Sequence, residues 1–244
     1  MRHPRRKLGI ALAALALILA GFTGFLAYVG YFGGPLYYDM APARPAPPAM
    51  KGLAVVLVSG DMGFKIGMGP DIAKRFAADG VPVVGVSSLA YFRQQRTPAE
   101  IQKLIADAAR RALAFGKADR LMMIGQSFGS DMMHVGLTGL PQDLRAKVKL
   151  VALVVPTDTV YYHVSPSEMF SLTKPDAMAL PTGRQLTWAP TLCVQGEEET
   201  NSLCPMLTQP NVRRVALPGG HMLHHDPDTL YDTLHSAITD ITKN

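Results

Sequence analysis

The sequence is poor in cysteine, with only Cys193 and Cys204 among its 244 residues. Two thiols are too few for a structural zinc site unless histidines complete it, and no histidine lies between or beside them. The sequence also lacks a nucleotide-binding loop and a redox motif. We therefore expect neither a metal ion nor any other cofactor.

Acidic residues are missing from residues 1–34, whereas four arginine and lysine residues gather at the start of this segment. These four bases produce most of the formal net charge of +5, because they leave 20 bases against 19 acids in the remainder. A nearly neutral remainder does not provide the basic face that binds nucleic acid. The 48% of hydrophobic residues can fill a core, which excludes a disordered chain.

No charged side chain interrupts residues 8–32, LGIALAALALILAGFTGFLAYVGYF. About 20 helical residues span a bilayer core, so this run is long enough to cross a membrane. Since the bases precede it, the positive-inside rule predicts export of the rest of the chain. A cleaved signal peptide is the alternative, but its apolar region is typically about 7–15 residues. We expect residues 1–34 to be a retained signal anchor, and cleavage would release the domain on the same side.

Proline recurs every second or third position in residues 41–50, APARPAPPAM, which is typical of a stiff extended spacer. We therefore place a linker at 35–50 and the folded domain at 51–244. In an exported chain, Cys193 and Cys204 indicate a disulfide that closes a small loop. Two buried free thiols are the alternative.

Short apolar runs alternate with helical patterns along the expected domain. The run at 53–59 is valine-rich and continuous, as in a strand buried on both faces. The clearest helix start is Thr97-Pro98-Ala99-Glu100, a capping box with proline at the first helical position. This alternation predicts an α/β fold, with a mostly parallel sheet covered by helices on both faces. Strands are expected at 53–59, 81–86, 121–124, 148–155, 191–195 and 212–217, and helices at 71–78, 131–136, after Thr97 and after Asp226.

Residues 125–129, GQSFG, fit the pattern G-x-S-x-G around Ser127. The pattern follows an expected strand and precedes a helical stretch, which is the context of a nucleophile elbow. Such a turn exposes the serine at a helix N-terminus, where free N–H groups favour an oxyanion. We predict that Ser127 is a nucleophile, and a Gly-Ser turn without chemistry is the alternative.

A histidine follows the last expected strand. Residues 218–221, PGGH, place His221 on a glycine-rich loop just before the final helix, where the base of such a fold stands. His221 would take the proton from Ser127 and return it to the leaving group. His224 and His225 are expected to be exposed loop residues that cap the final helix. Structural or exposed positions are expected for His134, His163 and His235.

The acid that orients the histidine must lie between Ser127 and His221 in chain order. The expected strand 191–195 is followed by Gly196 and by three glutamates. Glu199 is our first choice, because it stands three residues past the glycine, and Glu198 is the second. Asp158, after the fourth expected strand, is a further alternative.

Two backbone N–H groups are needed to stabilise an oxyanion. One would come from Phe128, directly after the nucleophile, and the other from the loop after the first strand. That loop is residues 59–64, SGDMGF, in which Met62 or Asp61 would present the amide. An ordinary glycine turn is the alternative.

Several blocks in combination resemble the VirJ/AcvB family of bacterial virulence-associated α/β-hydrolases, over roughly residues 53–240. The family's first block reads S-G-D-G-G-W, so Met62 and Phe64 depart from it, and Met222 stands where another histidine is expected. These departures could reshape the mouth of the site. The blocks that carry the resemblance are 59–64 (SGDMGF), 80–85 (GVPVVG), 88–92 (SLAYF), 96–98 (RTP), 125–129 (GQSFG), the loop from Cys193 through Gly196 to Cys204, and 217–221 (LPGGH).

The resemblance implies a periplasmic serine hydrolase, anchored to the inner membrane, that cleaves the ester of an aminoacylated phospholipid such as lysyl-phosphatidylglycerol. The Glu197–Glu199 cluster could attract the cationic lysyl group. In plant-associated members the family is linked to type IV secretion, so an interaction module for secretion components or exported proteins is one alternative. A general periplasmic esterase or thioesterase with small acyl substrates is another alternative. The lack of a long lid insertion fits it, since only the connection 157–190 is long enough for a cap.

Overall fold

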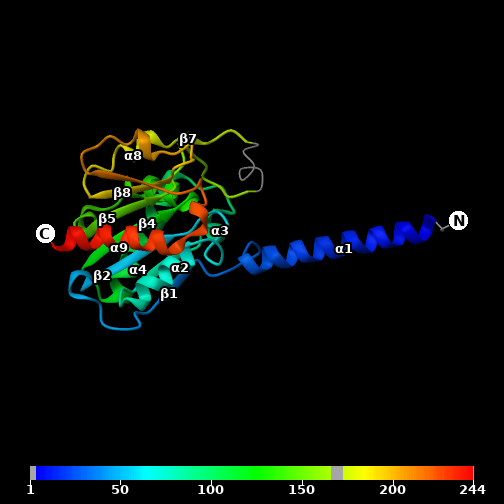
Figure 1. Cartoon of the computed structure of the whole chain (residues 1–244), viewed down its shortest axis with the longest axis horizontal. Coiled ribbons are helices and arrows are strands. Elements are labelled where there is room, and N and C mark those ends of the chain that lie inside the picture. The colour runs from blue at the N-terminus through cyan, green and yellow to red at the C-terminus, as the bar shows by residue number, and fades with distance from the viewer. Residues whose placement is uncertain (1–3, 166–172, 244) are drawn as a thin grey trace.

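The computed structural model describes residues 4–165 and 173–243. Within these ranges the centre is a seven-stranded sheet in the order β1-β3-β2-β4-β5-β8-β9, parallel throughout except that β1 runs antiparallel to β3 (Figure 1). A small antiparallel pair, β6 with β7, lies in the connection from β5 to β8. The strands are β1 Tyr37–Met40, β2 Leu53–Val58, β3 Val83–Val86, β4 Arg120–Gln126, β5 Val148–Val154, β6 Thr159–Val160, β7 Ala177–Met178, β8 Thr191–Gly196 and β9 Val212–Leu217.

Helices cover both faces of the sheet, as expected for the α/β fold. Alternate residues of β2 point to opposite faces, so Val56 packs in the cluster with α4 and α5 and Leu57 in the cluster with α2 and α9. Thr97 caps α4 with the capping box predicted, since Glu100 N–H donates to Thr97 Oγ1 and Glu100 accepts from the Thr97 N–H. The helices are α1 Pro4–Val29, α2 Gly69–Ala78, α3 Ser88–Phe92, α4 Pro98–Gly116, α5 Phe128–Leu137, α6 Gln142–Arg145, α8 Leu180–Gly183 and α9 Pro227–Lys243, with short 3-10 turns at η1 Pro48–Met50, η2 Cys204–Met206 and η3 Leu223–His225.

The folded domain begins before the boundary expected at Lys51. Residues Tyr37–Met40 form β1 and pair with β3. The proline-rich segment after β1 packs on the domain instead of separating it from the N-terminal helix: Ala43 N–H donates to the Ala77 carbonyl, and Met50 is fully buried. A four-residue, half-buried edge strand has too short an apolar pattern to be recognised from the sequence.

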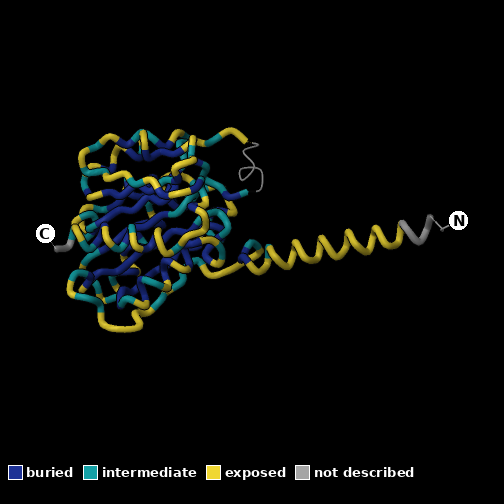
Figure 2. Tube along the Cα trace, in the orientation of Figure 1, coloured by how far each residue is buried: buried dark blue, intermediate teal, exposed yellow. Residues whose placement is uncertain are grey.

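Helix α1 projects from the domain as a long exposed rod (Figures 1 and 2). Among the described residues it is the one helix whose length and composition would let it cross a membrane, over Leu8–Val29 with a mean hydropathy of 2.4. The 22 residues of Leu8–Val29 extend about 33 Å, close to the thickness of a bilayer core.

Candidate active site

The turn at Ser127 joins the end of β4 to the start of α5. Ser127 has φ +53° and ψ −126°, a conformation that L-residues seldom adopt and that a nucleophile elbow requires. A Cβ at Gly125 would lie 2.4 Å from the Gly129 carbonyl oxygen, and one at Gly129 would lie 2.3 Å from the Ser59 carbonyl oxygen. Both flanking positions therefore exclude any side chain, which is the physical reason for the G-x-S-x-G pattern.

A continuous chain of hydrogen bonds links Ser127, His221 and Glu199. Ser127 Oγ lies 2.7 Å from His221 Nε2, and His221 Nδ1 lies 2.7 Å from Glu199 Oε1. Because a carboxylate can only accept, Nδ1 carries the proton and Nε2 is left to accept from the serine hydroxyl. The Glu199 side chain is 2% exposed, whereas His221 is 36% exposed and accessible from the pocket. These are the contacts that a Ser–His–acid triad requires.

Backbone and disulfide contacts hold the loop that carries Glu199. Glu199 Oε2 accepts the Gly196 N–H at 2.8 Å, which fixes the carboxylate at the end of β8. The predicted disulfide between Cys193 and Cys204 is confirmed, and it joins the two ends of this loop. Of the other acids considered, Glu198 is exposed, and Asp158 donates its backbone N–H to Asn201 across the loop.

A cavity of about 460 Å³ opens over Ser127 and His221. Its apolar walls include Ile66, Val155 and Met222. Two carboxyl groups, those of Asp61 and Asp131, also line it, while none of the described lining residues is a lysine or arginine. The cavity therefore suits an uncharged or cationic group better than an anion.

Asp131 lies at the cavity wall, on the first turns of α5. Its carboxyl accepts the Thr157 N–H at 3.0 Å and the Thr157 hydroxyl at 2.9 Å, and burial raises its pKa well above the usual value. Behind it, burial lowers the pKa of His134 to about 3, so this imidazole is neutral at physiological pH. The separation of 3.9 Å between His134 Nε2 and Asp131 Oδ1 therefore does not represent an ion pair.

The loop after β2 approaches the nucleophile. A Cβ at Gly60 would lie 3.7 Å from Ser127 Cβ, and Ser88 holds the start of the loop by donating its N–H and hydroxyl to Ser59. The Asp61 carboxyl is mostly buried, which raises its pKa, while the Met62 N–H and the nearby His221 partly oppose that rise. The Met62 amide, one of the two alternatives predicted for the second oxyanion donor, therefore donates to the Asp61 carboxyl in this structure.

Phe128 lies at the pocket, whereas His224 and His225 lie at the surface near the start of α9. Phe128 is the first residue of α5 and lines the pocket, and the rings of Phe92 and Phe128 pack edge to face. His224 and His225 are exposed, as expected, but they do not cap α9: Asp226 accepts the N–H groups of Asp228 and Thr229.

Asp131, Thr157 and His163 are among the pocket residues that the sequence did not reveal. Asp131 follows Ser127 by four positions, so helical spacing places both on one side of α5 and could have revealed it. His163 lines the pocket rather than occupying a position remote from it, and no local pattern in the sequence indicates that placement. The glutamate cluster proposed to attract a cation contributes none of the described lining residues, because Glu197 and Glu198 point to solvent and Glu199 binds His221.

The sheet order, the elbow and the pocket at the carboxyl ends of the strands define a protein of the α/β-hydrolase fold, and solved structures agree. Est1E from Butyrivibrio proteoclasticus is 12% identical, with a TM-score of 0.60 over 85% of this chain and 94% of that one. Proline iminopeptidase from Mycobacterium smegmatis is 14% identical, with a TM-score of 0.58 over 84% and 94%. The esterase domain of a Rhodothermus marinus protein is 13% identical, with a TM-score of 0.55 over 83% and 91%.

The chain belongs to the VirJ family. The family model described as bacterial virulence protein (VirJ) matches residues 52–242, nearly the whole folded domain. A comparison with curated proteins gave no significant match. The family and its hydrolase-fold neighbours together support a hydrolase.

Proposed function

We propose that this protein is a serine hydrolase in which Ser127 is the nucleophile, His221 the general base and Glu199 the acid that orients it. The observation that carries the proposal is the unbroken chain of two 2.7 Å contacts from Ser127 through His221 to Glu199, beside an open cavity. The Phe128 amide and the amide of Met62 or Asp61 are the proposed oxyanion donors.

The proposed substrate is an aminoacyl ester of a phospholipid, similar to lysyl-phosphatidylglycerol. Such a substrate carries an ammonium group beside the ester carbonyl. Asp61 and Asp131 supply carboxyl groups in the cavity, and the described lining adds no basic side chain to repel the cation. The apolar helix α1 and the disulfide fit export to the periplasm and anchorage in the inner membrane.

The chemistry then follows the double displacement of serine esterases. Ser127 Oγ attacks the ester carbonyl carbon while its proton moves to His221 Nε2. The tetrahedral oxyanion collapses, the bond to the lipid oxygen breaks, and His221 returns the proton to that oxygen. Water activated by His221 attacks the aminoacyl-enzyme ester, which frees the amino acid and restores the Ser127 hydroxyl.

Release of lysine from lysyl-phosphatidylglycerol in vesicles tests this proposal. Wild type should release lysine, and Ser127→Ala should reduce the rate at least about a thousandfold, because it removes the nucleophile. Ser236→Ala, an exposed serine on α9, is the matched control and should keep full activity. Equal rates for wild type and Ser127→Ala would refute the role of Ser127.

A general esterase or thioesterase for small acyl groups is the second candidate, since much of the cavity wall is apolar. Faster turnover of soluble short-chain esters than of the vesicle lipid would favour it. An interaction module linked to secretion predicts instead that Ser127→Ala preserves the biological phenotype.

A further inference from the structure

Helix α1 ends against the rim of the active-site pocket. Val29, near its last turn, is 2% exposed and belongs to the core of the domain. Lys65 Nζ donates to the Tyr28 carbonyl at 2.8 Å, and Arg93 donates to the Tyr31 carbonyl at 3.3 Å. Lys65 lies in the same loop after β2 that brings Asp61 and Ile66 to the pocket. The anchor and the pocket mouth therefore share one structural element.

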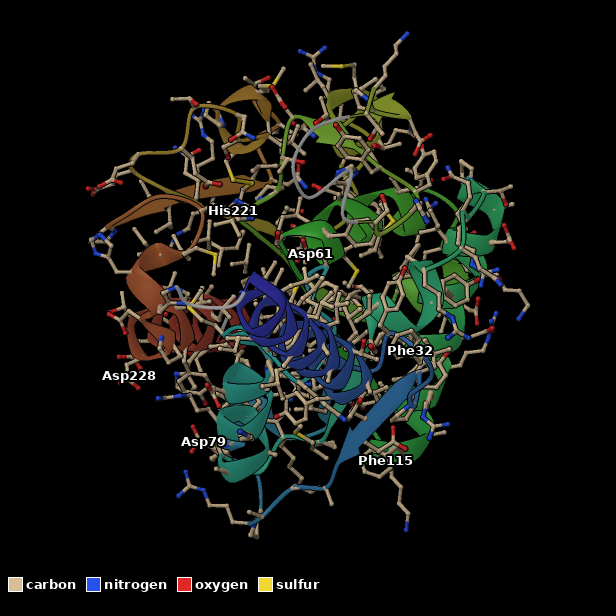
Figure 3. The ribbon with its side chains drawn as sticks, turned by 90° about the vertical axis from the view of Figure 1, so that its right-hand side faces the viewer. Phe32, Asp61, Asp79, Phe115, His221 and Asp228 are labelled. Atoms are coloured by element: carbon tan, nitrogen blue, oxygen red, sulfur yellow. A yellow bond between two sulfur atoms is a disulfide. The ribbon has the colours of Figure 1, made fainter. Side chains whose placement is uncertain are left out.

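The path of the chain into the sheet places α1 at the active-site edge. Because β1 is antiparallel to β3, its first residue Tyr37 pairs with Val86, the last residue of β3. Leu36 extends this pairing by accepting the Ser87 N–H at 2.9 Å. The carboxyl ends of the parallel strands carry the pocket, so the chain enters the sheet at that same edge. In the view from the side on which α1 leaves the domain, the labels of Phe32, Asp61 and His221 stand around the projection of the helix (Figure 3).

The connection between α1 and β1 is short. Residues 30–36 alone separate them, and the proline-rich segment lies after β1, so it does not act as a spacer. Contacts on both sides of this connection fix the direction in which α1 leaves. If α1 crosses a bilayer, the end of the domain that carries the pocket must face the membrane surface.

The exposed side chains around this end suit a lipid surface. Tyr28 and Phe32 are exposed beside the end of α1, and Met222 is 50% exposed at the pocket mouth. Aromatic rings with this placement are typical of the membrane interface. Lys65 and Arg93 add two cations, and neither forms an ion pair with a carboxylate among the described residues.

We infer that the pocket mouth lies against the bilayer from which α1 emerges, with Lys65 and Arg93 on the phosphates of lipid headgroups, so that a lipid enters the pocket directly from the membrane. This inference rests on the proposed function for the identity of the lipid. It adds a division of charge: the basic rim binds the phosphodiester, and the Asp61 carboxyl inside the cavity faces the cationic aminoacyl group.

Fluorescence quenching tests the orientation without any turnover. Trp188 is the sole tryptophan, and it lies three residues before the start of β8, so it lies at the amino ends of the strands, away from the pocket. The full chain is reconstituted in phosphatidylethanolamine–phosphatidylglycerol vesicles that carry a nitroxide on the headgroup. Wild type should show little quenching, and Met222→Trp should add a strongly quenched component. The inference would be overturned if the added component were quenched no more than the emission of Trp188.

Charge reversal tests the role of the rim. Lys65→Glu/Arg93→Glu should lower hydrolysis of the vesicle lipid about tenfold or more, because basic residues near an anionic surface hold the protein on it and acidic replacements are repelled. Turnover of a soluble aminoacyl ester should not change. Lys51→Glu/Arg110→Glu makes the same change in net charge away from the pocket, and it should leave both rates unchanged; equal losses in the two double variants would overturn the role of the rim.

The two failures can be told apart. Absence of lipid hydrolysis in wild type counts against the proposed substrate, while the quenching result still decides the orientation. Normal lipid hydrolysis by wild type, together with an unquenched tryptophan in the Met222→Trp variant, would leave the proposed function in place and overturn the inference. Lys65→Arg keeps the charge, and it should retain the vesicle activity that Lys65→Glu loses.

Discussion

His221 Nδ1 lies 2.7 Å from Glu199 Oε1, and the second oxygen of that carboxylate accepts the Gly196 N–H at 2.8 Å. Both oxygens of Glu199 are therefore engaged, one by the imidazole and one by the backbone at the end of β8. The carboxylate is positioned by the fold, and it in turn positions the imidazole. This relationship makes Glu199, rather than its neighbours, the residue whose charge the proposed chemistry needs.

Glu199→Gln should lower kcat about a thousandfold or more, because an amide can donate to Nδ1 and favour the wrong tautomer of His221. Glu198→Gln is the matched control: Glu198 is adjacent but exposed, and its replacement should leave kcat within about twofold. Steady-state kinetics on a soluble aminoacyl ester measures both. A larger loss in Glu198→Gln than in Glu199→Gln would transfer the role to Glu198.

Cys193→Ser/Cys204→Ser should destabilise the domain by roughly 3 kcal/mol, the value expected for a disulfide that closes a short loop. The opened loop carries Glu199, so kcat should fall as well. Chemical denaturation and kinetics of the double variant provide the two readouts. Unchanged kcat in a destabilised variant would show that the backbone contacts of the loop hold Glu199 without the disulfide.

Asp61→Asn should raise KM for a lysyl ester about tenfold to a hundredfold, because it removes a carboxylate that faces the ammonium group. A neutral acyl ester of similar size should lose far less, since it has no cation to pair. Comparison of kcat/KM for the two esters isolates the effect of charge. A parallel loss on both esters would assign Asp61 to the oxyanion loop rather than to substrate charge.

His134 should make stability depend on pH. Burial lowers the pKa of His134 to about 3, below its ordinary value of 6.5, so between these values the unfolded state binds the proton and the folded state does not. Above pH 6.5 the imidazole is neutral in both states, so His134 does not change the free energy of unfolding with pH. Below pH 6.5 the free energy of unfolding decreases as the pH falls, by up to about 1.4 kcal/mol per pH unit.

Denaturation of wild type and His134→Leu from pH 4 to pH 7.5 checks this prediction. The difference in unfolding free energy should change with pH below 6.5 and be flat above it. Asp131 acts in the opposite direction, because burial raises its pKa, but it is present in both proteins and largely cancels. A pH-independent difference would mean that His134 titrates normally in the folded state.

Much of the fold could be predicted from the sequence, since the central strands are short, largely apolar runs and the alternation of strands and helices is regular. The two glycines of the elbow are constrained by close backbone contacts and Gly219 by its positive φ of +94°, so they leave a readable pattern. Strand β1 could not be predicted, because its four residues lie at a half-buried edge and gain their role only by pairing with β3.

The candidate site was predictable where chemistry depends on local spacing. Ser127, His221 and Glu199 each follow a strand at a characteristic offset, and the structure brings the three together. The rest of the pocket depends on tertiary packing. His163 and the docking of Lys65 and Arg93 on the end of α1 join segments far apart in the chain, and nothing in local sequence specifies such contacts.

Covalent labelling with a fluorophosphonate, followed by mapping of the modified residue by mass spectrometry, directly tests whether Ser127 is an activated nucleophile. An activated serine reacts without any assumption about the natural substrate. Wild type should be labelled at Ser127, Ser127→Ala should not be labelled, and Glu199→Gln and His221→Ala should react far more slowly. Absence of labelling in folded wild type, or labelling at another serine, would contradict the proposed role of Ser127.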